Sequence, residues 1–276
     1  MFRNILLPTD FSDISWNAIA YAIRLFEKEP CKFYLLHSTL MKVSTMESFT
    51  DRLAKTLIQS ARNDLDNWVK RIEDQTINPE HSYETIITEN HLDDSVEWAV
   101  DKYGIDLVVM ATKGATGAKG VLFGSNAVRV IKSVSNCPIL VVPEDFTFKR
   151  PKEIAFPTDF NREYTIKEVK PIKQIAQMFD AQIRILHINE EESLTQEQES
   201  NRVELTKFLE PVKHRFHWMP DYAKKANEIY VFIESLYLDM LAMVRYKHSV
   251  LEAIFNEPVI KKISFRTKVP FLVIPE

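Results

Sequence analysis

Short runs of apolar residues alternate along this chain with longer segments whose apolar residues recur every three or four positions. The short runs predict buried strands, and the longer segments predict amphipathic helices. In the first half the expected strands are 5–12 (with its closing turn), 33–37, 83–88, 105–111 and 137–143, and the expected helices are 16–26, 47–73, 92–103 and a segment from 125 onward. Several of these strands are apolar on both faces. The pattern therefore predicts an α/β fold with a parallel sheet covered by helices on both sides.

The pattern begins again after a polar connector at 144–151. Three landmarks recur in the same order, and they are the pairs 5–11 and 154–160, 34–37 and 184–187, and 137–144 and 269–276. The offset between copies falls from 149 residues at the first landmark to 132 at the last, a net deletion of 17 residues that we place mainly in the second helix and its loops. A chain of 276 residues also suggests two domains of roughly 150 residues each. We predict tandem domains at 1–145 and 151–276.

Glycine is concentrated in one loop of the first copy. The chain has 5 glycines, where average usage would give about nineteen. Four of them stand between the fourth strand and the following helix, at 114, 117, 120 and 124. Glycine permits close approach to the backbone, and a helix N-terminus attracts anions. The order strand, glycine loop, helix therefore predicts a phosphate site. The alternative is a surface hairpin without a ligand.

These motifs resemble the universal stress protein family, and the resemblance covers nearly the whole chain. Nucleotide-binding members carry Gly-x2-Gly-x9-Gly-Ser/Thr after the fourth strand. The match here is Ala111-x2-Gly114-x9-Gly124-Ser125, with alanine in place of the first glycine. The resemblance implies two five-stranded, doubly wound domains of the adenine nucleotide alpha hydrolase-like type, forming an intramolecular pseudo-dimer. It also implies bound ATP or AMP, with Mg2+ as a companion ion to be considered.

The resemblance assigns parts of the ligand to particular residues. Asp10 and the backbone near Ser38 would hold adenine. The residues that would line the nucleoside are Pro8, Thr9, Ala111 and its neighbour Met110. The residues that would donate to the phosphates are Gly114, Gly124, Ser125 and Asn126, with Lys113 and Lys119 adding positive charge. Two alternatives stay open at this point: Asp10 shapes a turn or caps a helix, and Ser125 is only a helix N-cap.

The second copy has lost the glycines. An alignment at the offset of 132 places Met243, Tyr246 and Asn256 at the glycine positions and Glu257 at the serine position. A bulky tyrosine and an anionic glutamate would block and repel a triphosphate. We therefore expect nucleotide in the first domain only. The second domain would bind something else or serve as the partner of the first.

Composition excludes several classes of function. A net charge of −4 without a long single-sign run argues against nucleic-acid binding. The apolar stretch 229–244 is interrupted by charges and too short to span a bilayer, and we expect no membrane partner. Two cysteines in apolar surroundings, Cys31 and Cys137, indicate a reducing compartment, so we expect a cytoplasmic protein. No histidine or carboxylate cluster predicts a metal site.

Three functions remain in competition. The leading one is a nucleotide-binding regulatory protein of the stress response. The second is an ATP-using enzyme, at most a slow ATPase, because no base or nucleophile stands beside the glycine loop and Rossmann and Walker motifs are absent. The third is a scaffold that binds an unidentified protein partner and no nucleotide. By resemblance we also expect the fifth strands, Ile139–Val142 and Phe271–Ile274, to pair within the chain, with homodimer formation left open.

Overall fold

The computed structural model describes residues 3–39, 47–75, 78–113, 123–189, 193–220, 225–246 and 268–276. It divides this chain into two compact units, and the described residues of the second begin at Lys149. No helix in the described ranges is long and apolar enough to cross a membrane.

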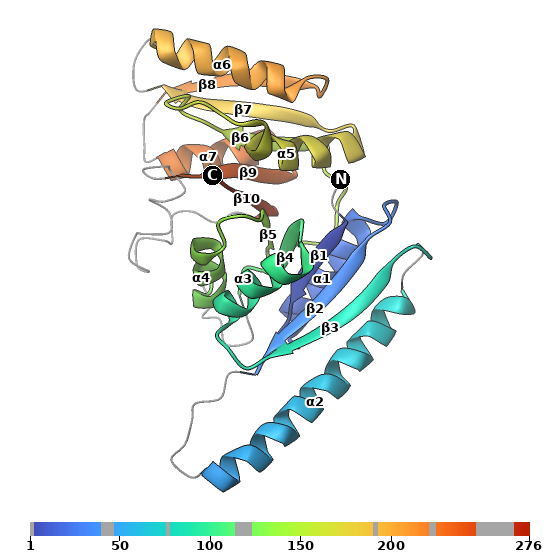
Figure 1. The fold of residues 1–276 in the computed structure, drawn as a ribbon. Coiled ribbons are helices and arrows are strands. Elements are labelled where there is room, and N and C mark those ends of the chain that lie inside the picture. Colours follow the sequence, from blue (N-terminus) through green and yellow to red (C-terminus); the bar gives the residue numbers. More distant parts are fainter. Residues whose placement is uncertain are drawn as a thin grey trace. The chain divides into compact units, whose positions relative to one another are not determined.

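The first unit alternates strands and helices (Figure 1). Its described elements are β1 (Asn4–Pro8), α1 (Asp13–Leu25), β2 (Lys32–Ser38), α2 (Glu47–Glu73), β3 (Ser82–Thr88), α3 (Leu92–Tyr103), β4 (Leu107–Ala111), α4 (Ser125–Ser133) and β5 (Ile139–Val142). The strands of this part lie in the order β3-β2-β1-β4-β5, and their pairings are parallel. Because β1 has β2 on one side and β4 on the other, the strand order reverses beside β1.

Helices cover both faces of this sheet. Trp16 of α1 meets Trp68 of α2 edge to face, with ring centroids 5.2 Å apart, so these two helices share a face. On the other face α3 packs against α4. The central strand is correspondingly apolar after its first residue, and Ile5, Leu6 and Leu7 have no exposed surface.

The second unit repeats this arrangement. Its described elements are β6 (Glu153–Pro157), α5 (Ile166–Phe179), β7 (Gln182–Asn189), α6 (Gln196–Leu209), β8 (His214–Pro220), α7 (Lys225–Ser235), β9 (Met240–Arg245) and β10 (Phe271–Pro275). The order of its described strands is β8-β7-β6-β9-β10, again with parallel pairings. Two tandem five-stranded parallel sheets, counted over the described ranges, confirm the predicted fold class.

Local sequence explains where the helices begin and end. Ser12 caps α1 by accepting a hydrogen bond from the backbone N–H of Ser15. Thr165 and Glu168 form a reciprocal capping box at α5, which satisfies two backbone donors. Gly104 ends α3 in the left-handed region, at a φ of 59°, where glycine carries no steric cost.

Among the described elements, the second helices of the two units differ most in length. α2 has 27 residues and α6 has 14, which accounts for most of the predicted deletion. Figure 1 shows α2 running alongside β3 in the first unit and α6 alongside β8 in the second. The expected pairing of the fifth strands of the two units stays a prediction.

Candidate functional site

A cavity of about 180 Å³ lies at the carboxyl ends of β1, β2 and β4, beside the point where the strand order reverses. Ligands of open parallel sheets bind at this place because the strand-end loops diverge there. The residues that line the cavity are Pro8, Thr9, Asp10, Ser15, His37, Ser38, His91, Leu92, Met110, Ala111, Lys113, Asn126, Ala127 and Arg129.

Most of the predicted site residues meet in this cavity. Those that line it are Pro8, Thr9, Asp10, Ser38, Met110, Ala111 and Asn126. Gly124 and Ser125 stand at the start of α4, immediately before Asn126, and are not among the lining residues. Gly114 and Lys119 lie outside the described residues.

The turn after β1 aims Asp10. Phe11 adopts a positive φ of 61°, and its backbone N–H donates to Thr9 Oγ1 at 3.1 Å. Asp10 Oδ1 accepts from the backbone N–H of Ser12 at 3.2 Å and from its hydroxyl at 2.5 Å. Asp10 therefore shapes the turn as predicted, but the cap of α1 is Ser12, so the expectation that Asp10 caps this helix is wrong.

The imidazole of His37 supports the same turn. Its Nδ1 lies 2.8 Å from the carbonyl oxygen of Thr9, and its ring centroid lies 4.4 Å from that of Phe11. A carbonyl only accepts, so Nδ1 carries the proton. His37 therefore has a structural role in this turn, and its side chain also borders the cavity.

The start of α4 supplies backbone donors. Gly124 is the N-cap and Ser125 the first helical residue, so the expectation that Ser125 is the N-cap is wrong. The backbone N–H of Gly124 donates to the carbonyl of Thr112 at 2.7 Å, which fixes the helix end to the segment after β4. The first-turn N–H groups of a helix have no partner within the helix, and they favour anions.

Charge is distributed unevenly around the cavity. Asp10 follows β1, whereas Lys113 follows β4 and Arg129 stands on α4. Lys113 Nζ lies 3.4 Å from each carboxylate oxygen of Glu144, and 11% of its side chain is exposed. The arrangement therefore places an acceptor on the β1 side and cations on the β4–α4 side.

Sequence reasoning missed several lining residues. They are Ser15, His91, Leu92, Ala127 and Arg129. Arg129 carried a usable signal, because it stands three residues after Asn126 and so lies on the same face of α4. Its Nη2 donates to Asn126 Oδ1 at 2.6 Å.

The second unit keeps the turn that carries the aspartate. Phe160 has a φ of 56° and donates its N–H to Thr158 Oγ1 at 3.1 Å, while Asp159 Oδ1 accepts from Asn161 N–H at 3.1 Å. His187 Nδ1 lies 3.1 Å from the carbonyl of Thr158. Each contact has its counterpart around Asp10, so Asp159 is placed as Asp10 is.

Strand pairing corrects the predicted alignment of the two copies by one residue. Ile5 pairs with Leu107, and its counterpart Ile154 pairs with Met240. The fourth strands of the two units therefore correspond at an offset of 133, not 132. Tyr246 consequently stands at the position of Lys113 rather than Gly114, and Val244 stands at the position of Ala111.

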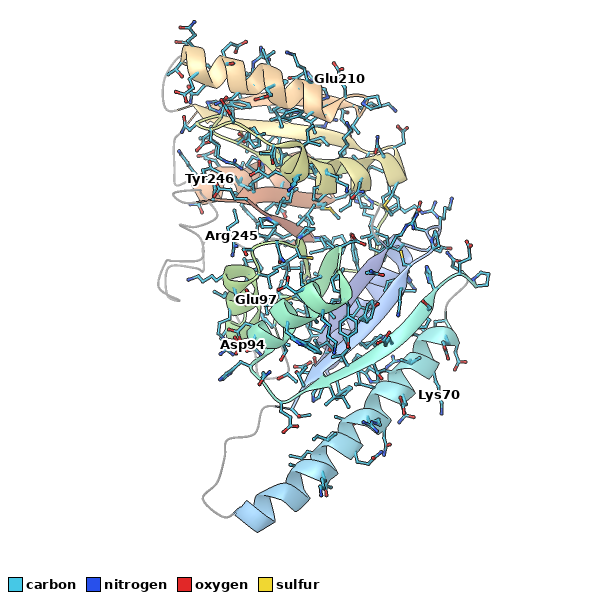
Figure 2. All side chains as sticks on the ribbon, viewed as in Figure 1. Lys70, Asp94, Glu97, Glu210, Arg245 and Tyr246 are labelled. Atoms are coloured by element: carbon cyan, nitrogen blue, oxygen red, sulfur yellow. The ribbon has the colours of Figure 1, made fainter. Side chains whose placement is uncertain are left out.

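Two tyrosines fill the region in front of Asp159. Tyr246 follows Arg245, the last residue of β9 (Figure 2). Its hydroxyl lies 2.9 Å from both carboxylate oxygens of Asp159. The Tyr164 hydroxyl bonds to Thr158 Oγ1, as Ser15 does to Thr9. Burial, and then the negative charge of Asp159, raise the pKa of Tyr246, so its hydroxyl keeps the proton that it donates.

The space left beside these tyrosines is about 30 Å³, room for little more than a water molecule. Arg162 packs over both rings, 5.1 Å from the centroid of Tyr164 and 4.6 Å from that of Tyr246. A separate polar recess of about 180 Å³ remains beside Asp159, lined by Asn161, His187, Ile188, Ser193, Thr195, Gln198 and Lys225. The two units thus share the turn that carries the aspartate and its hydrogen bonds, and they differ in the side chains that lie in front of that aspartate.

Comparison with known proteins gives consistent matches. The model of the universal stress protein family matches residues 1–143. The universal stress protein MJ0531 of Methanocaldococcus jannaschii is 30% identical over 156 residues, covering 55% of this chain and 85% of that protein. MJ0577, a universal stress protein of the same organism, is 30% identical over 159 residues, covering 51% of this chain and 95% of its own.

A solved structure resembles the whole chain. The universal stress protein from Archaeoglobus fulgidus matches with a TM-score of 0.72 at 17% identity, over 99% of this chain and 98% of that one. At this identity the match shows a shared fold. The family match, this shared fold and the strand order that repeats in the two units lead to one identification: this chain belongs to the universal stress protein family and is a tandem member.

Proposed function

We propose that this chain is a nucleotide-binding regulatory protein of the stress response, which binds one ATP or AMP in its first unit. The observation that carries the proposal is the cavity of the first unit, with its acceptor on one side and its cations and helix N-terminus on the other. The adenine amino group is a donor and suits Asp10. The phosphates suit the β4–α4 side, and Mg2+ is expected only as their counter-ion.

The comparison between units supports a single site. In the second unit, the hydroxyl of Tyr246 already donates to Asp159, the counterpart of Asp10. A ligand amino group would have to displace that hydroxyl and its ring. The proposal therefore limits nucleotide to the first unit and leaves the ligand of the second unit, if it has one, unassigned.

The test is the stoichiometry of binding in a matched pair of variants. Full-length protein is purified without added ligand, its nucleotide content is analysed, and ATP is titrated calorimetrically into the wild type, Asp10→Ala and Asp159→Ala. We expect close to one nucleotide per chain in the wild type and in Asp159→Ala. Asp10→Ala should bind at least tenfold more weakly, because it loses a hydrogen bond to a charged group.

A third variant, Gly124→Glu, tests the phosphate end by placing an anion at the start of α4. It should weaken ATP far more than adenosine. Two nucleotides per chain would show that the second unit also binds. No binding to wild type, with Mg2+ present, would refute the proposal and favour the scaffold function. Sustained phosphate release that Gly124→Glu abolishes would instead identify an ATPase.

A further inference from the structure

Asn126 and Arg129 form a pair on α4 at the edge of the cavity. Arg129 Nη2 donates to Asn126 Oδ1 at 2.6 Å, and both residues line the cavity of the first unit. They stand three positions apart, so their side chains occupy the same face of the helix. Asn126 is the second residue of α4 and follows Ser125 directly.

The chemistry of the pair fixes the orientation of the amide. A guanidinium has only donors, so the atom of Asn126 that meets Arg129 must be the carbonyl oxygen. The amide nitrogen, with two N–H donors, then points away from the guanidinium. Without Arg129 the amide could turn over and present its oxygen, which would repel an anion.

We infer that Arg129 is a positioning residue, which holds the Asn126 amide so that it donates to a phosphate group and thereby favours adenine nucleotides over the uncharged nucleoside. The inference rests on the proposed function and adds the origin of its selectivity. Phosphate oxygens only accept hydrogen bonds, so a fixed pair of N–H donors suits them.

The inference separates two parts of the ligand. Asp10 and the turn after β1 are placed for the base, and Arg129 is remote from them in the sequence and on another element. Loss of Arg129 should therefore change the affinity for phosphate-bearing ligands and leave the affinity for adenosine nearly unchanged. If Arg129 only stabilised α4, its loss would lower the affinity for adenosine and for the phosphate-bearing ligands alike.

The experiment measures the affinities of adenosine, AMP, ADP and ATP for wild type, Arg129→Ala, Asn126→Ala and the double variant. Each single variant should lower the affinity for ATP about tenfold, as expected for the loss of a charge-assisted hydrogen bond, and change the affinity for adenosine less than twofold. The double variant should also lose about tenfold, because the two residues act as one unit. Lys132→Ala removes the same charge from the last turn of α4 and is the matched control, expected within twofold of wild type.

Equal weakening of adenosine and ATP by Arg129→Ala would overturn the inference while leaving the proposed function intact. Additive losses, near a hundredfold in the double variant, would overturn it as well, because they mean independent contributions. Wild type that binds neither adenosine nor ATP would refute the proposed function itself.

Discussion

Lys113→Tyr would copy into the first unit the side chain that fills the second. Lys113 and Tyr246 occupy corresponding positions after β4 and β9, as the strand pairing shows. Because the turns that hold Asp10 and Asp159 share their hydrogen bonds, a tyrosine at 113 should donate to Asp10 as Tyr246 donates to Asp159. The prediction is that this one substitution closes the first site.

The magnitude follows from what a ligand would have to displace. A hydrogen bond to a charged group is worth about 1.5–3 kcal/mol. Burying an aromatic ring of this size contributes about 1.5–3 kcal/mol more. A ligand that displaces both loses about 3–6 kcal/mol, which weakens binding by a factor of about 10² to 10⁴. The lost ion pair of Lys113 with Glu144 should cost at most about 1 kcal/mol of stability.

The assay is calorimetric titration with adenosine and with ATP, after circular dichroism has shown that the variant is folded. Lys113→Met is the control, because it removes the charge and supplies neither the ring nor the hydroxyl. Lys113→Tyr should lower the affinity for adenosine and for ATP by a factor of about 10² to 10⁴. Lys113→Met should weaken ATP about tenfold or less and leave adenosine within twofold.

A folded Lys113→Tyr protein that binds adenosine as wild type does would refute the reasoning. The tyrosine would then lie away from Asp10, or the adenine would bind elsewhere. Equal loss of adenosine affinity in Lys113→Met would also contradict it, because that variant leaves the base end of the cavity open.

Three further predictions concern the described structure itself. Tyr246→Phe removes the donor to Asp159 and should lower the free energy of unfolding by about 1.5–3 kcal/mol in urea titration. An unchanged urea midpoint would contradict the assigned hydrogen bond. Burial raises the pKa of the Cys31 and Cys137 thiols to about 12, so native protein at pH 8 should react with iodoacetamide far more slowly than urea-unfolded protein, and equal rates would be the contrary result. Burial, and then the positive charges of the nearby Arg184 and Arg215, lower the pKa of His217 in the folded protein. Because the unfolded chain therefore takes up the proton at higher pH than the folded protein does, the contribution of His217 to stability is present above about pH 6.5 and is lost as the pH falls. An NMR titration midpoint of His217 at or above about 6.5 would refute this.

The sequence was sufficient to predict the fold because its two periodicities are strong. Apolar runs such as 5–7 and 107–111 are buried along their whole length, as expected of central parallel strands. The repeated Pro-Thr-Asp placed Asp10 and Asp159 correctly at equivalent strand ends. The side of the candidate cavity that contains Asp10 and the turn after β1 could therefore be predicted from the motif and the strand order.

The alignment of the fourth strands failed for an identifiable reason. It took its offset from the last strand, although the segment between the fourth and fifth strands is one residue shorter in the second copy. Asp106 and Asp239 would have given the right register, because each accepts one hydrogen bond from the backbone N–H of the residue before its own unit's first strand and one from the N–H of that strand's first residue. Their function is visible only once the strands are placed side by side.

Other residues could not be found from the pattern. Ser15 and Tyr164 belong to differently positioned helix starts, since α1 begins at Asp13 and α5 at Ile166. Their shared role toward Thr9 and Thr158 depends on where each hydroxyl reaches in space. Ser125 was a chemically sound N-cap candidate, but Gly124 takes that position, so residue preference alone did not fix the helix boundary to one residue.

The internal contact between Tyr246 and Asp159 has a consequence for how each half responds to metabolite supply. A site that binds a free ligand gains stability with ligand concentration, by RT ln(1 + [L]/Kd). A site whose donor is part of the chain gains the same kind of contact at every concentration. Under the proposed function, the first unit would become more stable as nucleotide accumulates. In the second unit the contact between Tyr246 and Asp159 would contribute the same stability at every nucleotide concentration.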